Sequence, residues 1–206
     1  MKIMIEPNDL KESYQLFQPS QPVLVTTRND NGTLNIAPFS WLSPVSGNPP
    51  MVALCLLTLP KKQDTLINIE RTMEFGINIP QIELVSKLVK ASFNYPPETS
   101  KFDVLGFTYQ QPNVINTGLV EECRVNFECK VRKMELIGDH TLIIADVVAG
   151  YYDERCFDEN MVLNLESVKT CHHLKKFIIE KGQKHIFMSK GKKVEVTEYY
   201  PEISTG

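Results

Sequence analysis

The sequence predicts a mainly β protein with a few packed helices, arranged as an antiparallel, Greek-key-like barrel. Two strand-like runs lie on either side of Asn31-Gly32, the kind of dipeptide that most strongly favours a tight hairpin turn. A long run that alternates polar and apolar residues precedes Gly138-Asp139, a second long run returns after it, and strands of such length are typical of barrels. A third observation is Met51–Leu59, which is apolar on both faces and is therefore expected to be a buried central strand.

Local patterns place the remaining elements of the first half of the chain. Leu10–Phe17 is expected to form a short leading helix that Pro19 ends. Two further helices are expected where apolar residues recur at helical spacing, with a strand between them. These helices are Lys61–Thr72 and Ile82–Ala91, the strand between them is Met73–Pro80, and the hairpin strands are Pro22–Arg28 and Thr33–Phe39.

The second half begins with Asn94–Gln111, an irregular connection long enough to be a functional lid or binding loop. The two long strands, Glu122–Ile137 and His140–Asp153, come next. Beyond residue 160 we expect a partly helical segment at Leu163–Ile179 and a short hairpin at Lys184–Val196 that turns at Gly191.

Composition excludes several classes of protein. With 206 residues, 42% hydrophobic and 23% charged, the chain suits one globular domain with a sizeable core. A formal net charge of −3 gives no general attraction to nucleic acid or to anionic membranes, so neither is expected as a partner. No signal peptide is expected, and the longest apolar run, Met51–Leu57, is far too short to span a bilayer. Five cysteines without a Cys-x-x-Cys pair indicate reduced thiols and a cytoplasmic location.

Generic catalytic signatures are missing from the sequence. It contains no phosphate-binding Gly-x-x-x-x-Gly-Lys, no Gly-x-Gly-x-x-Gly, no Gly-x-Ser-x-Gly and no His-Glu-x-x-His. Cys171-His172-His173, with His185 downstream, has no carboxylate at ligand spacing, so no metal site is expected.

An ordered set of motifs carries the functional information. Between Val23 and Asn68 the chain contains a VTT strand, a glycine-containing turn, Asn-x-Ala-Pro-x-Ser, a Val-Ser turn with Pro-Pro, and then Asp-Thr and Asn-Ile. EFGINI, NYPPETSKFDVLGFT and Glu128-Cys129 follow. In this order and spacing, roughly residues 20–150 resemble the flavin reductase-like family, FMN-binding split β-barrel proteins of the flavoredoxin and NAD(P)H:flavin oxidoreductase type.

The start of the helix expected at 61–72 suits a phosphate group. Charged and hydroxyl side chains gather there, next to backbone N–H groups that favour anions. Lys62, Thr65 and Asn68 are three residues apart and can share one helical face. The resemblance assigns the FMN phosphate to these three residues. On the residues alone, a surface helix capped by Asp64, with Lys61 and Lys62 solvated, is the commoner arrangement.

The resemblance places the flavin ring against residues 35–40, although on spacing alone an irregular strand end is the commoner explanation. Thr26 and Thr27 point to opposite faces of their strand, and Thr27 is assigned to the ligand. Trp41, the only tryptophan, flanks the cofactor or nicotinamide, or else anchors the core or a dimer interface. The predicted cofactor-binding residues are Thr27, Asn35, Ala37, Pro38, Ser40, Trp41, Lys62, Thr65 and Asn68.

The implied activity is redox chemistry with non-covalent FMN and with NAD(P)H as the electron donor. Hydride passes through FMN N5 to a flavin, ferric or protein acceptor, and because the cofactor carries the chemistry, no catalytic acid or base is assigned. The alternative is a flavoredoxin-like electron carrier that holds FMN and uses a protein donor without oxidising NAD(P)H directly. A storage or sensing protein without productive electron exchange is a third alternative.

The resemblance also bears on the organisation of the chain. It implies a single split-barrel domain over residues 1–206, with a core at about 20–155, and a homodimer whose subunits share the flavin sites. Residues 160–206 are expected to be a divergent extension that packs on the core or on the dimer partner. This extension is rich in lysine and lacks the Arg-Leu-Gly-Gly-x-Tyr ending common in the family.

Overall fold

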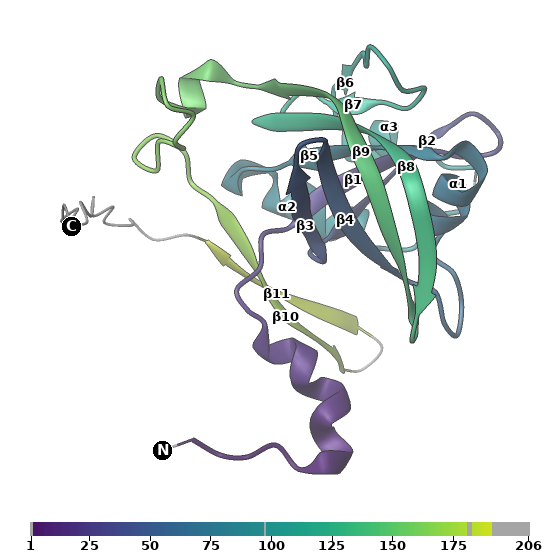
Figure 1. Ribbon diagram of the computed structural model, residues 1–206, viewed down its shortest axis with the longest axis vertical. Coiled ribbons are helices and arrows are strands. Elements are labelled where there is room, and N and C mark those ends of the chain that lie inside the picture. Colours follow the sequence, from purple (N-terminus) through teal and green to yellow (C-terminus); the bar gives the residue numbers. More distant parts are fainter. Residues whose placement is uncertain (1, 97, 181–182, 191–206) are drawn as a thin grey trace, which may run out of the picture.

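The computed structural model describes residues 2–96, 98–180 and 183–190, and an antiparallel sheet of seven strands forms its body (Figure 1). The strand order is β2-β1-β5-β8-β9-β4-β3. The two edge strands, β2 and β3, follow one another in the chain but do not pair, so the sheet does not close. The expected mainly β, antiparallel fold is confirmed. The strands are β1 (Val23–Arg28), β2 (Leu34–Phe39), β3 (Leu42–Gly47), β4 (Pro50–Leu57), β5 (Glu74–Ile79), β8 (Val125–Ile137) and β9 (His140–Tyr152).

The hairpins predicted around Asn31-Gly32 and Gly138-Asp139 are both present. β1 pairs with β2 from Val23 opposite Phe39 to Arg28 opposite Leu34, and the turn between them places Gly32 at a φ of 83°, which favours glycine. β8 and β9 pair along their length around a turn in which Gly138 has a φ of 62°. Turn chemistry therefore fixes the register of both hairpins, as the sequence indicated.

The apolar strand β4 is less central than predicted. It lies second from the edge, between β9 and β3. Val52, Leu54 and Leu56 are buried, but the residues that alternate with them are only partly covered. Apolar side chains on both faces therefore do not indicate a central strand here, because the outer face of β4 is only partly buried.

Two helices confirm predictions, with shifted boundaries. α1 (Asp64–Thr72) begins three residues later than expected. The second predicted helix is a 3₁₀ turn, η2 (Ile82–Leu84), that continues as α2 (Val85–Ala91). Within the described residues, no helix has the length and apolar character needed to cross a membrane.

The connection predicted to be irregular at 94–111 contains short elements. α3 (Lys101–Leu105) is capped by Ser100, whose side chain accepts a hydrogen bond from Asp103 N–H, and it ends at Gly106 with a φ of 64°. A two-stranded sheet of β6 (Tyr109–Gln110) and β7 (Leu119–Val120) follows. The Ser-x-x-Asp pattern and the glycine are the local signals that the prediction overlooked.

Two apolar cores lie on opposite faces of β1. Alternate residues of β1 point to α1 on one side and to α2 and α3 on the other, so Val25 and Leu24 belong to different cores. The first core includes Leu66 and Ile69 of α1. The second includes residues of α2 and α3, among them Phe102. This double burial explains why β1 is apolar and β-branched on both faces.

The two ends of the described chain differ most from expectation. The leading helix is a 3₁₀ helix, η1 (Pro7–Leu16), and buries none of its residues. The helix predicted within 163–179 is wrong, because β10 (Cys171–Glu180) pairs there with β11 (Gln183–Lys190). The hairpin predicted at 184–196 is also displaced, since 183–190 forms one strand only, and Gly191–Val196 lie outside the described residues. Partner pairing and β-forming residues such as Ile178 outweigh the local helical pattern.

The C-terminal hairpin lies beside η1, on one side of the barrel (Figure 1). An isolated bridge between Ser20 and His173 joins it to the chain just before β1. The division into a core and a divergent extension remains a prediction.

Glu128 on β8 is a buried carboxylate with a full set of donors. It has no exposed surface, and it accepts hydrogen bonds from the backbone N–H groups of Asn113, Val114 and Ile115 at 2.6–2.8 Å and from Tyr151 Oη at 2.5 Å. Burial alone would raise the pKa of the carboxyl, but these hydrogen bonds hold it below its usual value. The carboxylate thus fastens the 113–115 loop to the sheet.

Replacing Glu128 with Gln should lower the free energy of unfolding at pH 7 by about 2–3 kcal/mol, since an amide cannot accept from all four donors. Because the native pKa is lowered, the carboxylate stabilises the fold fully above the unfolded-state pKa of about 4.3, and this contribution is lost as the pH falls through the native pKa. Urea denaturation between pH 7 and pH 3 should show the difference between wild type and variant shrinking. Glu159→Gln, a change at an exposed turn position, is the control, and a difference between wild type and Glu128→Gln that stays constant with pH would contradict the assignment.

Gly76 on β5 is required by the close approach of Thr26 on the neighbouring strand β1 and of Leu119 on β7. A Cβ atom at this position would clash with Thr26 Oγ1 and would lie 2.8 Å from Leu119 Cδ2. Both neighbours are fully or almost fully buried and have little room to move.

We expect Gly76→Ala to lower the free energy of unfolding by about 1–3 kcal/mol, because overpacking must displace β1 or the β7 segment. Gly47→Ala is a matched control, since nothing lies within 4 Å of a Cβ there. Chemical denaturation of both variants measures the effect. Equal stability would show that Thr26 and Leu119 can move enough to accommodate the added methyl group.

Candidate functional site

Four predicted cofactor residues form one buried hydrogen-bonded cluster. Asn35 Nδ2 on β2 lies 3.3 Å from Thr27 Oγ1 on β1 and 3.1 Å from Thr65 Oγ1 on α1. Asn68 Nδ2 donates to Thr27 Oγ1 at 3.0 Å and to Asn29 Oδ1 at 2.8 Å. Thr27, Asn35, Thr65 and Asn68 are all buried, so this cluster, called the Thr27 cluster below, joins β1, β2 and α1.

The cluster limits what its members can offer a ligand. Both amide hydrogens of Asn68 are used inside the protein, so only its carbonyl oxygen is left for a ligand. Thr65 is 2% exposed and accepts from Asn35. The assignment of these residues to a cofactor remains a prediction. Their mutual hydrogen bonds hold β1, β2 and α1 together beside the site.

Lys62 does not share a helical face with Thr65 and Asn68, and that prediction is wrong. α1 begins at Asp64, so Lys62 lies outside the helix, and its ammonium forms an ion pair with Glu70 at 2.7 Å. Asp64 is not the capping residue either, because Gln63 occupies the N-cap position and makes no side-chain capping bond. Two residues of non-helical backbone before Asp64 turn the lysine toward solvent.

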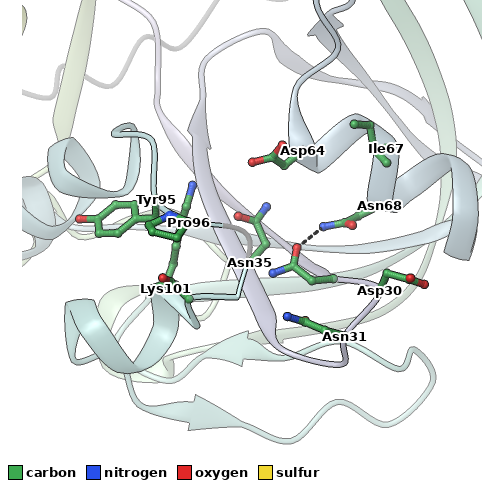
Figure 2. A pocket seen from close by; sticks show the side chains of 11 residues that line it. Asp30, Asn31, Asn35, Asp64, Ile67, Asn68, Tyr95, Pro96 and Lys101 are labelled. Carbon is green, nitrogen blue, oxygen red and sulfur yellow. Dashed lines mark hydrogen bonds between the residues drawn. The ribbon is translucent and has the colours of Figure 1, made fainter.

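A pocket of about 280 Å³ lies beside the Thr27 cluster (Figure 2). Amides and carboxylates from the β1–β2 turn and α1 face the 95–101 segment across it. The pocket includes Asn35 and Asn68 but none of the other predicted residues. The lining residues are Asn29, Asp30, Asn31, Asn35, Asp64, Ile67, Asn68, Tyr95, Pro96, Thr99 and Lys101.

Lys101 is the cation of this pocket, and the sequence prediction missed it. Lys101 is only 9% exposed, and its ammonium lies 5.5 Å from the centre of the Tyr95 ring. Burial lowers its pKa, while the nearby charge of Asp64 partly offsets this. Lys101 lies in the NYPPETSKF stretch that the family resemblance quoted, but neither charge nor spacing distinguished it from the other 21 Lys and Arg residues.

The remaining predicted residues lie along the edge strand and at the corner that follows it. Ala37 and Pro38 are on β2, the edge strand, where a proline costs no ladder hydrogen bond on the open side. Ser40 and Trp41 connect β2 to β3. Ser40 Oγ lies 3.0 Å from His173 Nδ1 of β10.

Trp41 is part of an aromatic stack at this corner. Its ring lies 4.4 Å from that of His140, almost parallel at 18°, and Tyr14 of η1 packs edge-on at 5.7 Å. His140 Nδ1 also contacts Asp139 at 2.6 Å. His140 and His173 were not among the predicted cofactor residues. For His140, the Gly-Asp-His turn was the only local signal. The structure therefore separates the predicted residues into a pocket end and a corner end, connected by β2.

Comparison with known proteins identifies the class. A family-wide sequence model described as the flavin reductase like domain matches residues 17–171. The chain belongs to this flavin reductase-like family.

Relatives and solved structures agree with that assignment. An uncharacterized protein of Aquifex aeolicus is 29% identical over 147 residues, which is 70% of this chain and 75% of that protein. The nitrilotriacetate monooxygenase component B from Bacillus cereus superposes with a TM-score of 0.76 at 23% identity, covering 95% of this chain and 99% of that one. The flavoredoxin from Methanosarcina acetivorans gives 0.68 at 18% identity, covering 100% and 97%. At these identities the structures establish the shared fold, the split barrel.

Thr27→Val tests the supporting role of the Thr27 cluster. Valine keeps the shape but removes the acceptor shared by Asn35 and Asn68, so the free energy of unfolding should fall by about 1–3 kcal/mol. Urea denaturation of the protein without added cofactor measures this, with Ser86→Ala, which removes an exposed hydroxyl on α2, as the control. Unchanged stability would mean that the buried amides find other partners.

Proposed function

We propose that the protein is an FMN-binding oxidoreductase of the NAD(P)H-dependent flavin reductase type, which passes electrons to a flavin, ferric or protein acceptor. The observation that carries this proposal is family membership over three quarters of the chain. Among proteins of the same fold, one is named NADH:FAD oxidoreductase and another FMN-binding protein. Five free thiols support a reducing, cytoplasmic setting.

The donors and acceptors of the site fit this cofactor. The pocket offers the Lys101 ammonium for an anion and the Asn68 carbonyl and Asp64 carboxylate for the hydroxyls of a ribityl chain. The outer edge of β2 presents backbone groups suited to the polar rim of a flat ring. When bound, FMN supplies the hydride-accepting chemistry that these side chains lack. Ser40 and the backbone N–H groups would then orient the ring and stabilise developing negative charge.

A homodimer is part of the proposal. η1 buries none of its residues and exposes Leu10, Leu16 and Phe17, and Leu136 and Ile137 are exposed at the end of β8. Apolar exposure of this kind is typical of surfaces that a partner covers. A second subunit would also enclose a flavin that the open edge of the sheet leaves exposed.

The alternative is a flavoredoxin-like electron carrier. It is favoured by the tail, which lacks the family's Arg-Leu-Gly-Gly-x-Tyr ending. Where that ending is absent, a nicotinamide has fewer expected contacts, and a protein donor could serve instead.

Two measurements test the function. Purified protein with bound FMN should be yellow, with the visible absorption of a flavin. Mixed without oxygen with NADH or NADPH in a stopped-flow instrument, the bound flavin should bleach within seconds. If neither nucleotide bleaches the bound flavin but a reduced protein donor does, the protein is the electron carrier. A failure to bind flavin would refute both the reductase and the carrier.

A further inference from the structure

His173 of β10 connects the C-terminal hairpin to the corner that follows β2. Its Nδ1 lies 3.0 Å from Ser40 Oγ, although the two residues are far apart in the chain. Its backbone also exchanges two hydrogen bonds with Ser20. Ser20 N–H donates to His173 C=O at 3.1 Å, and His173 N–H donates to Ser20 C=O at 2.8 Å. The proposed function gives this histidine no role.

These contacts hold His173 between the two ends of the β1–β2 pair. Val23 pairs with Phe39, so the segment that enters β1 lies beside the residue that follows β2. Ser20 belongs to the entering segment, and Ser40 is the residue that follows β2. The histidine thus bonds to the first through its backbone and to the second through its side chain.

The backbone of His173 is fixed on both of its edges. Ser20 bonds to one edge, and on the other edge the residue lies opposite Met188 of β11, just before the pairing shifts between His173 and Phe177. Nδ1 is the ring nitrogen nearer to the backbone, and the imidazole is rigid. A fixed backbone therefore restricts where this nitrogen can lie, which suits it to hold a hydroxyl in one orientation.

The hydroxyl of Ser40 carries one hydrogen, and the direction of that hydrogen decides what the serine can offer a ligand. If Nδ1 of His173 carries a hydrogen, it donates to Ser40 Oγ and leaves the hydroxyl hydrogen for another acceptor. If Nδ1 carries none, the hydroxyl donates to it, and the serine can only accept from a ligand. The state of Nδ1 therefore selects between a donor and an acceptor at Ser40.

We propose that His173 is a positioning residue, which donates from Nδ1 to Ser40 Oγ and thereby directs the serine's hydrogen toward the rim of the flavin ring. The inference rests on the proposed function, in which Ser40 orients the ring and stabilises developing negative charge. A directed donor stabilises the reduced, more negatively charged ring more than the oxidised one. His173 acts through Ser40 and favours the reduced state of the cofactor.

The alternative is that the side-chain bond only fastens the hairpin to the body of the protein. The bridge between His173 and Ser20 does this already, and it is made by backbone atoms. Replacing the imidazole therefore leaves the bridge in place, so the effect of the side chain on Ser40 can be measured separately.

Binding of oxidised and of reduced FMN tests the positioning role. His173→Leu should weaken binding of reduced FMN about 10-fold more than binding of oxidised FMN, which lowers the two-electron midpoint potential of the bound flavin by about 30 mV. His173→Asn, whose side-chain N–H can replace the Nδ1–H, should restore most of the wild-type potential. His172→Leu is the matched control, because adjacent residues of a strand face opposite sides and His172 bonds to Thr170 instead.

A double-mutant cycle separates positioning from a purely structural role. In a Ser40→Ala background, His173→Leu should shift the potential no further, because its effect passes through the serine hydroxyl. Equal shifts in the two backgrounds would show that the histidine acts on the fold rather than on Ser40. That result, or an unchanged potential in His173→Leu alone, would overturn the proposal.

The hydrogen bond can also be measured without flavin. Nitrogen NMR of the isotope-labelled protein should show a hydrogen on Nδ1 of His173, and the signal of that nitrogen should change in Ser40→Ala. An Nδ1 without a hydrogen would refute the proposal even if flavin binds. If the NMR result is as expected but wild type binds no flavin, the proposed function fails, and the inference about the ring fails with it. If flavin binds and its potential does not respond to His173, only the positioning role fails.

Discussion

The two amide hydrogen bonds accepted by Thr27 Oγ1 are the constraint on which the site depends. They come from Asn35 on the edge strand and from Asn68 on α1, so a single hydroxyl fixes the helix against the open side of the sheet. The ladder between β1 and β2 holds these two strands together, but α1 lies outside it. Buried polar bonds join the helix to both strands, and they help to define where the pocket, the helix N-terminus and β2 lie relative to one another.

The sequence predicted those parts of the fold that local chemistry determines. Asn31-Gly32 and Gly138-Asp139 specify their turns through backbone conformation, and both hairpins followed. It failed where pairing with another strand, rather than the pattern within a segment, decides the structure. β10 is a strand because β11 pairs with it, and no pattern within Leu163–Ile179 reports that pairing.

The same distinction separates the residues of the site. Thr27, Asn35, Thr65 and Asn68 were predicted separately, for different parts of the cofactor, and the structure brings them from two strands and a helix into one cluster. Lys101 was missed because its burial depends on the Tyr95 segment folding over the pocket, which the sequence does not encode locally. Lys62 was selected from the resemblance and from its spacing to Thr65 and Asn68, but the helix begins after it, and its ammonium pairs with Glu70 instead.

The stack of Trp41 on His140 gives the corner a natural optical reporter. As the chain contains one tryptophan, its intrinsic emission comes from the junction of β2 and β3 alone. Any change in how His140 or Tyr14 packs against this ring would therefore alter the emission of a single known position, the junction between the two edge strands of the open sheet.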